Sequence, residues 1–293
     1  MTGLCEGRSC VITGAGRGIG RAHAEALVAE GAHVVVNDVD GEVVDAVVAS
    51  LAATGGTAVG HVGDVSTAEG AAAIVRTALD AWGRLDVVVN NAGITRDRML
   101  VNLSESDWDD VLRVHLKSTF LVSQRAAQHW RERAKAGDQL DARIVNTVSS
   151  VGLYGNVGQA NYGAAKGGIA SFTLIAAMEL ARYGVTVNAV CPTALTDMTA
   201  STFLAETDDA RAGLYDPKWV SPAVVWLASP ASSAVTGRII VASGRRLAIA
   251  EGWRRGPTAP PVADVAEVGA VLEALLADAA PNADVQGTRP PAG

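Results

Sequence analysis

Seven short runs of apolar, strand-forming residues recur along this 293-residue chain, and longer segments of helical periodicity separate them. The apolar runs occupy residues 9–13, 32–38, 57–62, 85–91, 142–149, 185–190 and 237–243. Strands that are apolar on both faces and alternate with helices, such as those expected at 20–31 and 108–130, are typical of a parallel sheet covered on both sides. The pattern predicts a doubly wound α/β domain with right-handed crossovers, whose ligands bind at the carboxyl edge of the sheet.

The overall charge and the cysteines argue against several classes of function. A net charge of -7 and a pI near 5.2 disfavour a nucleic-acid or anionic-membrane partner, because phosphate contact needs clustered Lys and Arg. Cys5, Cys10 and Cys191 are odd in number and lack CxxC spacing, which supports neither a disulfide framework nor a metal site. No apolar run approaches bilayer length and no signal peptide is evident, so we expect a cytoplasmic protein with no membrane partner.

The composition changes after about residue 250, where prolines and polar residues become frequent. We expect residues 1–250 to form one domain that holds both the cofactor and the catalytic site. Residues 251–293 should form a C-terminal extension, made of a docked linker, a short amphipathic helix at 265–280 and a mobile end.

A glycine cluster stands between the first predicted strand and the first predicted helix, at Gly14, Gly16, Gly18 and Gly20. Backbone without Cβ atoms can approach a pyrophosphate closely, and the amides at a helix N-terminus point toward negative charge. The flanking strand and helix therefore favour a dinucleotide cradle over a glycine-rich turn without a ligand.

Asp38 ends the second predicted strand, eighteen residues after Gly20. A carboxylate there can accept hydrogen bonds from the adenosine ribose hydroxyls and would repel a 2'-phosphate, which predicts NAD rather than NADP. Arg17 in the glycine loop could neutralise such a phosphate, and Asp38 could alternatively be a simple turn residue of the segment NDVDG.

Tyr162 precedes Lys166 by four residues, which places both side chains on one face of a helix predicted at 161–180. At about 4 Å and an effective dielectric constant near 20, the ammonium would lower the phenol pKa from about 10 to near neutrality. Ser149, at the end of the preceding strand, could hold a substrate oxygen while Tyr162 acts as general acid or base. Taken alone, the Tyr–Lys spacing is more often a solvated surface pair.

Four motifs in this order resemble those of the short-chain dehydrogenase/reductase family. They are TGAGRGIG at 13–20, Asp64-Val65, NNAG at 90–93, and Ser149 with YGAAK at 162–166. The resemblance implies a single Rossmann-like domain with seven parallel strands, assembled as a homotetramer or homodimer. It also implies that Lys166 holds the nicotinamide ribose. The NAD-binding residues expected on these grounds are Gly14, Arg17, Gly18, Ile19, Gly20, Asp38, Asp64, Val65, Asn91, Ala92, Gly93, Tyr162, Lys166, Pro192, Thr193 and Thr196.

The chain departs from the family pattern at two places. His115 replaces the asparagine that is the family's fourth catalytic residue, which leaves a proton relay through His115 and a packed core histidine as equal alternatives. The stretch PTALTDM at 192–198 differs from the family's PGxxxT, so the cofactor contacts of Thr193 and Thr196 are the least secure.

Within the family, the segments around His115, Asp38 and Tyr162 are similar to the (3R)-hydroxyacyl-CoA dehydrogenase unit of the multifunctional β-oxidation enzyme and its bacterial single-domain relatives. This similarity implies an acyl-CoA substrate; β-ketoacyl reductases and hydroxysteroid dehydrogenases, with steroid alcohol or ketone substrates, are alternatives. An alternative of another class is a catalytically silent NAD-binding subunit. Six arginines could pair with CoA phosphates or simply be solvated: Arg96, Arg98, Arg245, Arg246, Arg254 and Arg255.

The helical segments 111–122 and 169–180 carry more apolar residues than one face of a sheet requires. We expect them to pair across a two-fold axis in a homo-oligomer, although they could also be ordinary sheet-covering helices.

Overall fold

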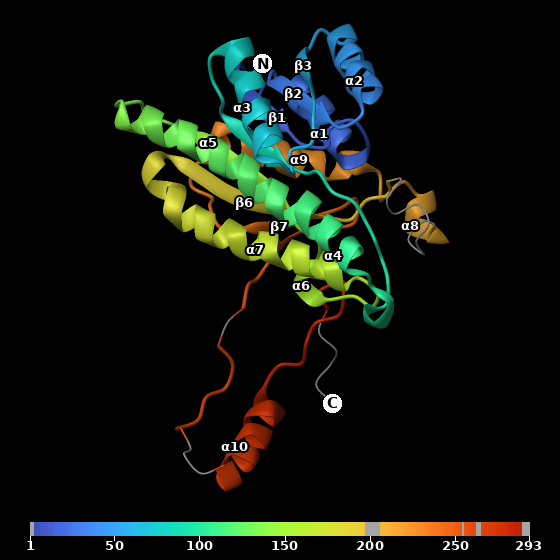
Figure 1. The fold of residues 1–293 in the computed structure, drawn as a ribbon. Helices are drawn as coiled ribbons and strands as arrows, with labels where there is room; N and C mark the ends of the chain where they lie inside the picture. The colour runs from blue at the N-terminus through green and yellow to red at the C-terminus, as the bar shows by residue number, and fades with distance from the viewer. Residues whose placement is uncertain (1–2, 197–205, 254, 262–264, 289–293) are drawn as a thin grey trace.

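A computed structural model describes residues 3–196, 206–253, 255–261 and 265–288 of the chain. Its described strands form one sheet in the order β3-β2-β1-β4-β5-β6-β7-β8, in which β1 to β7 run parallel (Figure 1). The order reverses beside β1, because β2 and β3 extend to one side of it and β4 to β7 to the other. The predicted doubly wound sheet is confirmed. The strands are β1 Ser9–Ile12, β2 His33–Asp38, β3 Thr57–Val62, β4 Val87–Asn90, β5 Ala142–Thr147, β6 Val185–Pro192, β7 Ile239–Ala242 and β8 Leu247–Ala250.

The number of strands differs from the prediction of seven, because β8 adds an antiparallel edge strand to β7. A tight turn, closed by the hydrogen bond from the Ser243 amide to the Arg246 carbonyl at 2.9 Å, joins the two strands. β8 has only four residues, and Leu247 and Ile249 on it are exposed. A run this short, next to the proline-rich extension, lacks the apolar signal of a buried strand.

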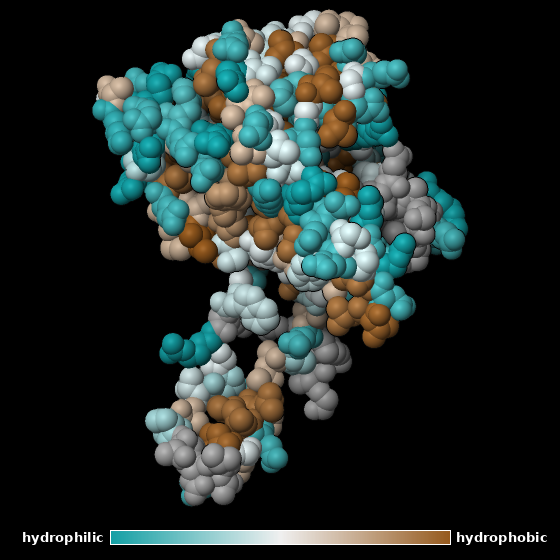
Figure 2. Space-filling view, in the orientation of Figure 1, coloured by the Kyte–Doolittle hydropathy of each residue, from teal (hydrophilic) through white to brown (hydrophobic). Residues whose placement is uncertain are grey.

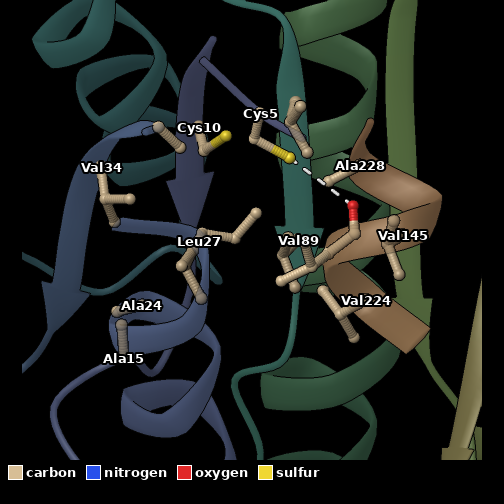
Figure 3. Packing of buried hydrophobic residues seen from close by; sticks show 14 of the residues in the cluster. Cys5, Cys10, Ala15, Ala24, Leu27, Val34, Val89, Val145, Val224 and Ala228 are labelled. Atoms are coloured by element: carbon tan, nitrogen blue, oxygen red, sulfur yellow. Dashed lines mark hydrogen bonds between the residues drawn. The ribbon is translucent and has the colours of Figure 1, made fainter. Parts of the chain in front are cut away.

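Helices cover both faces of the sheet, because alternate residues of each strand point to opposite sides. On one face of the sheet, Val11 of β1 belongs to a core that also contains residues of α3, α5 and α7. On the other face, Cys10 and Ile12 belong to a core that also contains residues of α1, α2 and α9. Figure 3 shows the core that contains Cys10, in which Leu27 of α1 and Val224 of α9 also lie. The described helices are α1 Gly18–Ala29, α2 Gly41–Ala53, α3 Ala68–Trp82, α4 Glu105–Leu112, α5 Ser118–Lys135, α6 Ser150–Tyr154, α7 Ala160–Leu180, α8 Asp208–Arg211, α9 Ser221–Ala228 and α10 Val265–Asp278.

The helix expected at 108–130 is interrupted between α4 and α5 by a π-helical turn at Arg113–Lys117. Such turns widen a helix by one residue and often occur at functional sites.

α7 and the turn that follows it qualify by length and composition as a candidate membrane span, Ala160–Tyr183, with a mean hydropathy of 1.2. The expectation that no segment approaches that length is therefore wrong on this criterion. The core helix of a soluble protein meets the same criterion, and Ile169, Ala176 and Ala177 of α7 are buried against the domain.

The C-terminal segment leaves the domain after β8 and carries α10 away from it at the end of an extended chain (Figure 1). The linker residues 251–253 and 255–261 are exposed, so the expected docked linker is wrong, and Trp253 is 99% exposed. A proline-rich stretch has few apolar side chains with which to pack. The expected mobile end lies partly outside the described residues, at 289–293, whereas Asp284–Thr288 forms a compact turn.

Candidate active site

The glycine loop joins β1 to α1 and has no room for side chains. Gly14 and Gly18 adopt φ values of +61° and +51°, which favour glycine. A Cβ atom on Gly20 would lie 2.1 Å from the Gly14 carbonyl oxygen. Arg17, the N-cap of α1, makes no side-chain capping hydrogen bond, so the first amides of α1 stay available for an anion. Ile19 packs beneath the loop against Ala194 and Val220. The loop therefore fits a pyrophosphate.

The segment after β4 is fastened to the glycine loop by Thr13. The Thr13 hydroxyl accepts hydrogen bonds from the backbone amides of Asn91, at 2.9 Å, and Ala92, at 3.0 Å. The Asn91 side chain in turn donates to the carbonyl oxygens of Thr13 and Gly14. The predicted pair of Asn91 and Ala92 is thus in place, but the sequence analysis gave Thr13 no role, although this residue opens the glycine motif.

The end of the site expected to hold adenosine, called the adenosine end below, includes Asp38, Asp40 and Arg17 beside the glycine loop. Asp38 ends β2, and its Oδ2 atom lies 2.6 Å from the position that a Cβ atom on Gly16 would occupy, so the carboxylate borders the glycine loop. Its Oδ1 atom accepts hydrogen bonds from the amides of Val39 and Asp40. Arg17 forms an ion pair with Asp40 at 2.6 Å, which the sequence analysis did not anticipate.

Asp64 follows β3 at the same edge and is held by two partners. Its Oδ1 atom accepts hydrogen bonds from the amide and the hydroxyl of Ser66, and its Oδ2 atom pairs with Arg113 at 2.9 Å. These hydrogen bonds, together with the Arg113 charge, outweigh the desolvation and lower the pKa of Asp64. Val65 is buried beside it. Arg113 was missed because it lies on the π-helical turn, far from Asp64 in the sequence.

The three predicted catalytic residues come together at the carboxyl end of β5. Ser149 is the N-cap of α6, where its side chain accepts a hydrogen bond from the Val151 amide at 3.3 Å, and it lies close enough to Tyr162 to act on the pKa of the phenol. Lys166 follows one turn after Tyr162 on α7, and its Nζ atom lies 5.8 Å from the centroid of the tyrosine ring. That Nζ atom donates to the Thr147 carbonyl at 2.7 Å.

The predicted pKa of Tyr162 is wrong, because burial outweighs the charge of Lys166. Desolvation, only partly offset by the hydrogen bond from Ser149, raises the pKa of Tyr162 to about 12 instead of lowering it to near neutrality. Burial likewise lowers the pKa of Lys166 to about 7. A group that loses its own charge so readily is a weak source of stabilisation for a phenolate, so burial dominates over the charge–charge attraction.

His115 lies buried in the π-helical turn and faces Tyr162 edge-on, with ring centroids 5.2 Å apart. Its Nε2 atom lies 2.7 Å from the Ile94 carbonyl oxygen and 3.0 Å from the Ile94 amide, whereas Nδ1 has no hydrogen-bond partner among the described residues. Desolvation, followed by the charge of Lys166, lowers the pKa of His115 to about 3. The His115 ring also fills the space next to Gly93, where a Cβ atom on Gly93 would lie 2.2 Å from the ring.

Three expected residues lie at or just after the end of β6. Pro192 is the last residue of β6, and the Thr193 amide donates to the Ala242 carbonyl at 3.1 Å, which fixes the chain as it leaves the sheet. Thr196 lies against the glycine loop, 3.0 Å from where a Cβ atom on Gly18 would be. The expected contacts with a cofactor stay predictions.

The arginines proposed for CoA phosphates do not form one cluster. Arg245 pairs with Asp209 at 2.8 Å, and Arg246 donates to the Gln286 carbonyl at 3.3 Å. Arg255 is exposed in the linker, and Arg254 lies outside the described residues. Arg96 and Arg98 lie in the exposed loop after β4.

Asn161, which the sequence analysis missed, fastens the loop after β4 to α7. Its buried side chain donates to the backbone carbonyls of Arg96, at 3.0 Å, and Asp107, at 3.2 Å. The loop is therefore held beside the residue that precedes Tyr162.

Comparison with known proteins agrees with this geometry. Residues 8–207 match the family model described as short chain dehydrogenase. The chain is 47% identical, over 83% of its length and 80% of the relative, to hydroxyacyl-CoA dehydrogenase ChsB1 of Mycobacterium tuberculosis. It is 40% identical, over 76% of its length, to peroxisomal multifunctional enzyme type 2 of Mus musculus, of which it covers 30%. A crystal structure of a short chain dehydrogenase from Mycobacterium avium superposes with a TM-score of 0.89 at 45% identity, covering 98% of this chain and all of that one.

Proposed function

Because the chain belongs to the short-chain dehydrogenase family, we propose that it transfers a hydride between NAD and a secondary alcohol or ketone, with a 3-hydroxyacyl-CoA as the substrate class. The observation that carries the proposal is the cluster of Ser149, Tyr162 and Lys166 at the carboxyl edge of the sheet, beside a loop that fits a pyrophosphate. The names of the relatives from Mycobacterium tuberculosis and Mus musculus support the substrate class.

In the proposed mechanism, the side chains at the carboxyl end of β5 manage the proton of the substrate oxygen. Ser149 donates a hydrogen bond that holds this oxygen. The Tyr162 hydroxyl donates its proton in the reduction direction and takes the proton back in the oxidation direction. Lys166 would hold the ribose next to the nicotinamide, and the bound nicotinamide would supply the hydride acceptor or donor.

The preference for NAD is supported by the charges around the adenosine ribose. Asp38 places a carboxylate at the glycine loop, where it would repel a 2'-phosphate. Arg17 is the cation in that loop, and its ion pair with Asp40 occupies it. The sequence analysis left the role of Arg17 open, and this ion pair favours NAD.

A homodimer or homotetramer is also part of the proposal. Phe120 on α5 and Leu174 and Met178 on α7 are 42%, 43% and 73% exposed, which leaves apolar surface on the helices expected to pair. Light scattering of the purified protein tests this, because a monomer would contradict it. A cytoplasmic location stays a prediction.

The proposed activity is tested by offering the protein NAD or NADP with two series of alcohols. These are 3-hydroxyacyl-CoA thioesters of increasing length, in both configurations, and steroid alcohols. We expect the thioesters to reduce NAD to NADH rapidly and NADP to NADPH much more slowly. A clear preference for steroid alcohols would favour a hydroxysteroid dehydrogenase, and a preference for NADP with the thioesters would favour a ketoacyl reductase. NAD binding with no turnover of any alcohol would support the silent subunit.

A further inference from the structure

The C-terminal arm, residues 251–288, contains the helix α10, whose apolar side is exposed. α10 has 14 residues, and Val268, Leu272 and Leu276 on it are 36%, 51% and 72% exposed. Spacings of four residues place these side chains on one side of the helix. Figure 2 shows the resulting hydrophobic surface on the arm below the domain. A single helix of this length is marginal in water, so contact with another surface is expected to stabilise it.

The charges on α10 define what kind of surface would suit it. The helix carries Glu267, Glu273 and Asp278, and its sequence contains no Lys, Arg or His. A complementary surface would be apolar and bordered by positive charge.

The domain presents such a surface, which we call the rim patch, defined as Met99, Leu100, Val101 and Val157. These side chains are 54%, 72%, 89% and 77% exposed. Two loops carry them, and the loops are tied together by the hydrogen bonds from the Arg98 amide to the Gly158 carbonyl and from the Gln159 side chain to Asp97, each 2.9 Å. The rim patch is therefore held in shape before any partner arrives.

Positive charge and the candidate active site both adjoin the rim patch. Arg96 and Arg98 belong to the same loop as Met99, and both are exposed. The Arg96 carbonyl is bound by Asn161, the residue before Tyr162. A segment that covers the rim patch would thus border the entrance to the site.

Both ends of the arm are anchored on the domain of the same chain. At one end, the pairing of β8 with β7 fixes the chain up to Ala250. At the other end, Asp284–Thr288 forms a turn with hydrogen bonds from the Asp284 amide to Thr288 and from the Gly287 amide to Asp284, both 2.8 Å. This turn is anchored on the domain, since the Arg246 side chain donates a hydrogen bond to the Gln286 carbonyl. Gly287 also lies against the Tyr154 ring, 2.9 Å from where a Cβ atom on Gly287 would be. Between these anchors α10 projects away from the domain (Figure 1).

We propose that α10 binds the rim patch of a second copy of this chain, so that two copies exchange arms and each arm borders the partner's active site. A two-fold arrangement repeats the same contact twice, so it covers the apolar side of α10 and the rim patch in each chain and brings the acidic helix to the arginines of the loop.

Cross-linking between different single-cysteine variants tests the exchange directly. Full-length Leu272→Cys and Val101→Cys proteins are mixed, incubated to exchange subunits and treated with a short bismaleimide. The three natural cysteines are buried, and burial raises the pKa of the Cys5 thiol to about 11 and that of Cys191 to about 12, so they react slowly. We expect a product of twice the chain mass. The matched control is Ala270→Cys, an exposed residue on the opposite side of α10, which should give several-fold less product with Val101→Cys.

Two outcomes would overturn the proposal. One is a Leu272→Cys/Val101→Cys double variant that cross-links only within single chains, because α10 would then bind its own domain. The other is equal product from the Leu272 and Ala270 mixtures, or none. Leu276→Cys with Val157→Cys provides a second pair in case a variant of the first pair does not fold, and failure of both pairs rejects the exchange. The readout needs no turnover, so it is independent of the proposed activity.

Discussion

The two ends of the candidate cofactor site handle charge in opposite ways. At the adenosine end the charged side chains are half exposed and paired, since the Arg17 and Asp40 side chains are 58% and 40% exposed and those of Arg113 and Asp64 are 41% and 45% exposed. At the catalytic end Lys166 and His115 are 3% and 1% exposed, and neither forms an ion pair with a carboxylate of the described residues. Exposure leaves charges intact but weakens their interactions, whereas burial changes the charges themselves.

All three titratable groups at the catalytic end shift toward their neutral forms. The pKa of Tyr162 is raised to about 12, that of Lys166 is lowered to about 7, and that of His115 is lowered to about 3, with desolvation as the largest cause each time. Tyr162 therefore keeps its proton more firmly than usual, whereas Lys166 and His115 lose theirs more readily. We expect substitutions there to have large effects and substitutions at the adenosine end to have small ones.

The largest effect is expected for Tyr162→Phe. Loss of the only proposed proton carrier should lower kcat by roughly 10²- to 10⁴-fold, while NADH binding, measured by fluorescence titration, stays nearly unchanged. Tyr183→Phe, a change of the same kind at the far end of α7, serves as the control and should keep full activity. Substantial turnover by Tyr162→Phe would remove Tyr162 from the mechanism.

The protonation of Tyr162 itself can be measured without substrate. The near-ultraviolet phenolate absorbance of the wild type minus that of Tyr162→Phe should show no signal up to about pH 10, the ordinary tyrosine pKa, because burial raises the pKa of Tyr162 to about 12. A difference signal with a midpoint near neutral pH would instead restore the dominance of the Lys166 ammonium. Repeating the titration with NAD present shows whether the bound cofactor changes the balance.

The sequence was sufficient for those parts of the site that depend on local spacing. The glycine loop, Asp38 at the end of β2 and the spacing of Tyr162 and Lys166 all follow from short motifs on predicted elements. The pair of Arg113 and Asp64 did not, because it joins residues 49 positions apart through a π-helical turn that interrupts a regular helical pattern. The prediction of a lowered pKa for Tyr162 was wrong for a related reason. Sequence spacing reveals a neighbouring charge, but desolvation depends on how many atoms the fold packs around the phenol.

His115 should affect stability more than the pH dependence of activity. Its pKa of about 3 in the folded protein lies below the ordinary histidine value of 6.5. Between these pH values the unfolded chain binds more protons, so the free energy of unfolding falls as the pH falls. The free energy of unfolding of wild type and of His115→Asn is measured in urea between pH 7 and pH 4. The slopes of this free energy against pH should differ by on the order of 1 kcal/mol per pH unit. The control is His129→Asn, at a half-buried position on α5, which should change this slope less than His115→Asn does. Parallel curves for His115→Asn and wild type would contradict a buried neutral histidine.

The smallest effect is expected at the adenosine end, for Asp40→Asn. Asn keeps the N-cap of α2, where Asp40 accepts from the Val43 amide, but releases Arg17 from its ion pair. Exposed pairs are worth about 0.2–1 kcal/mol, so kcat/KM with NADP should rise about 1.5- to 5-fold relative to NAD. Asp45→Asn, on the exposed side of α2, is the control and should change neither value. The gain should vanish in Arg17→Met/Asp40→Asn; if it persists there, Asp40 repels the 2'-phosphate directly and Arg17 has no part in cofactor choice.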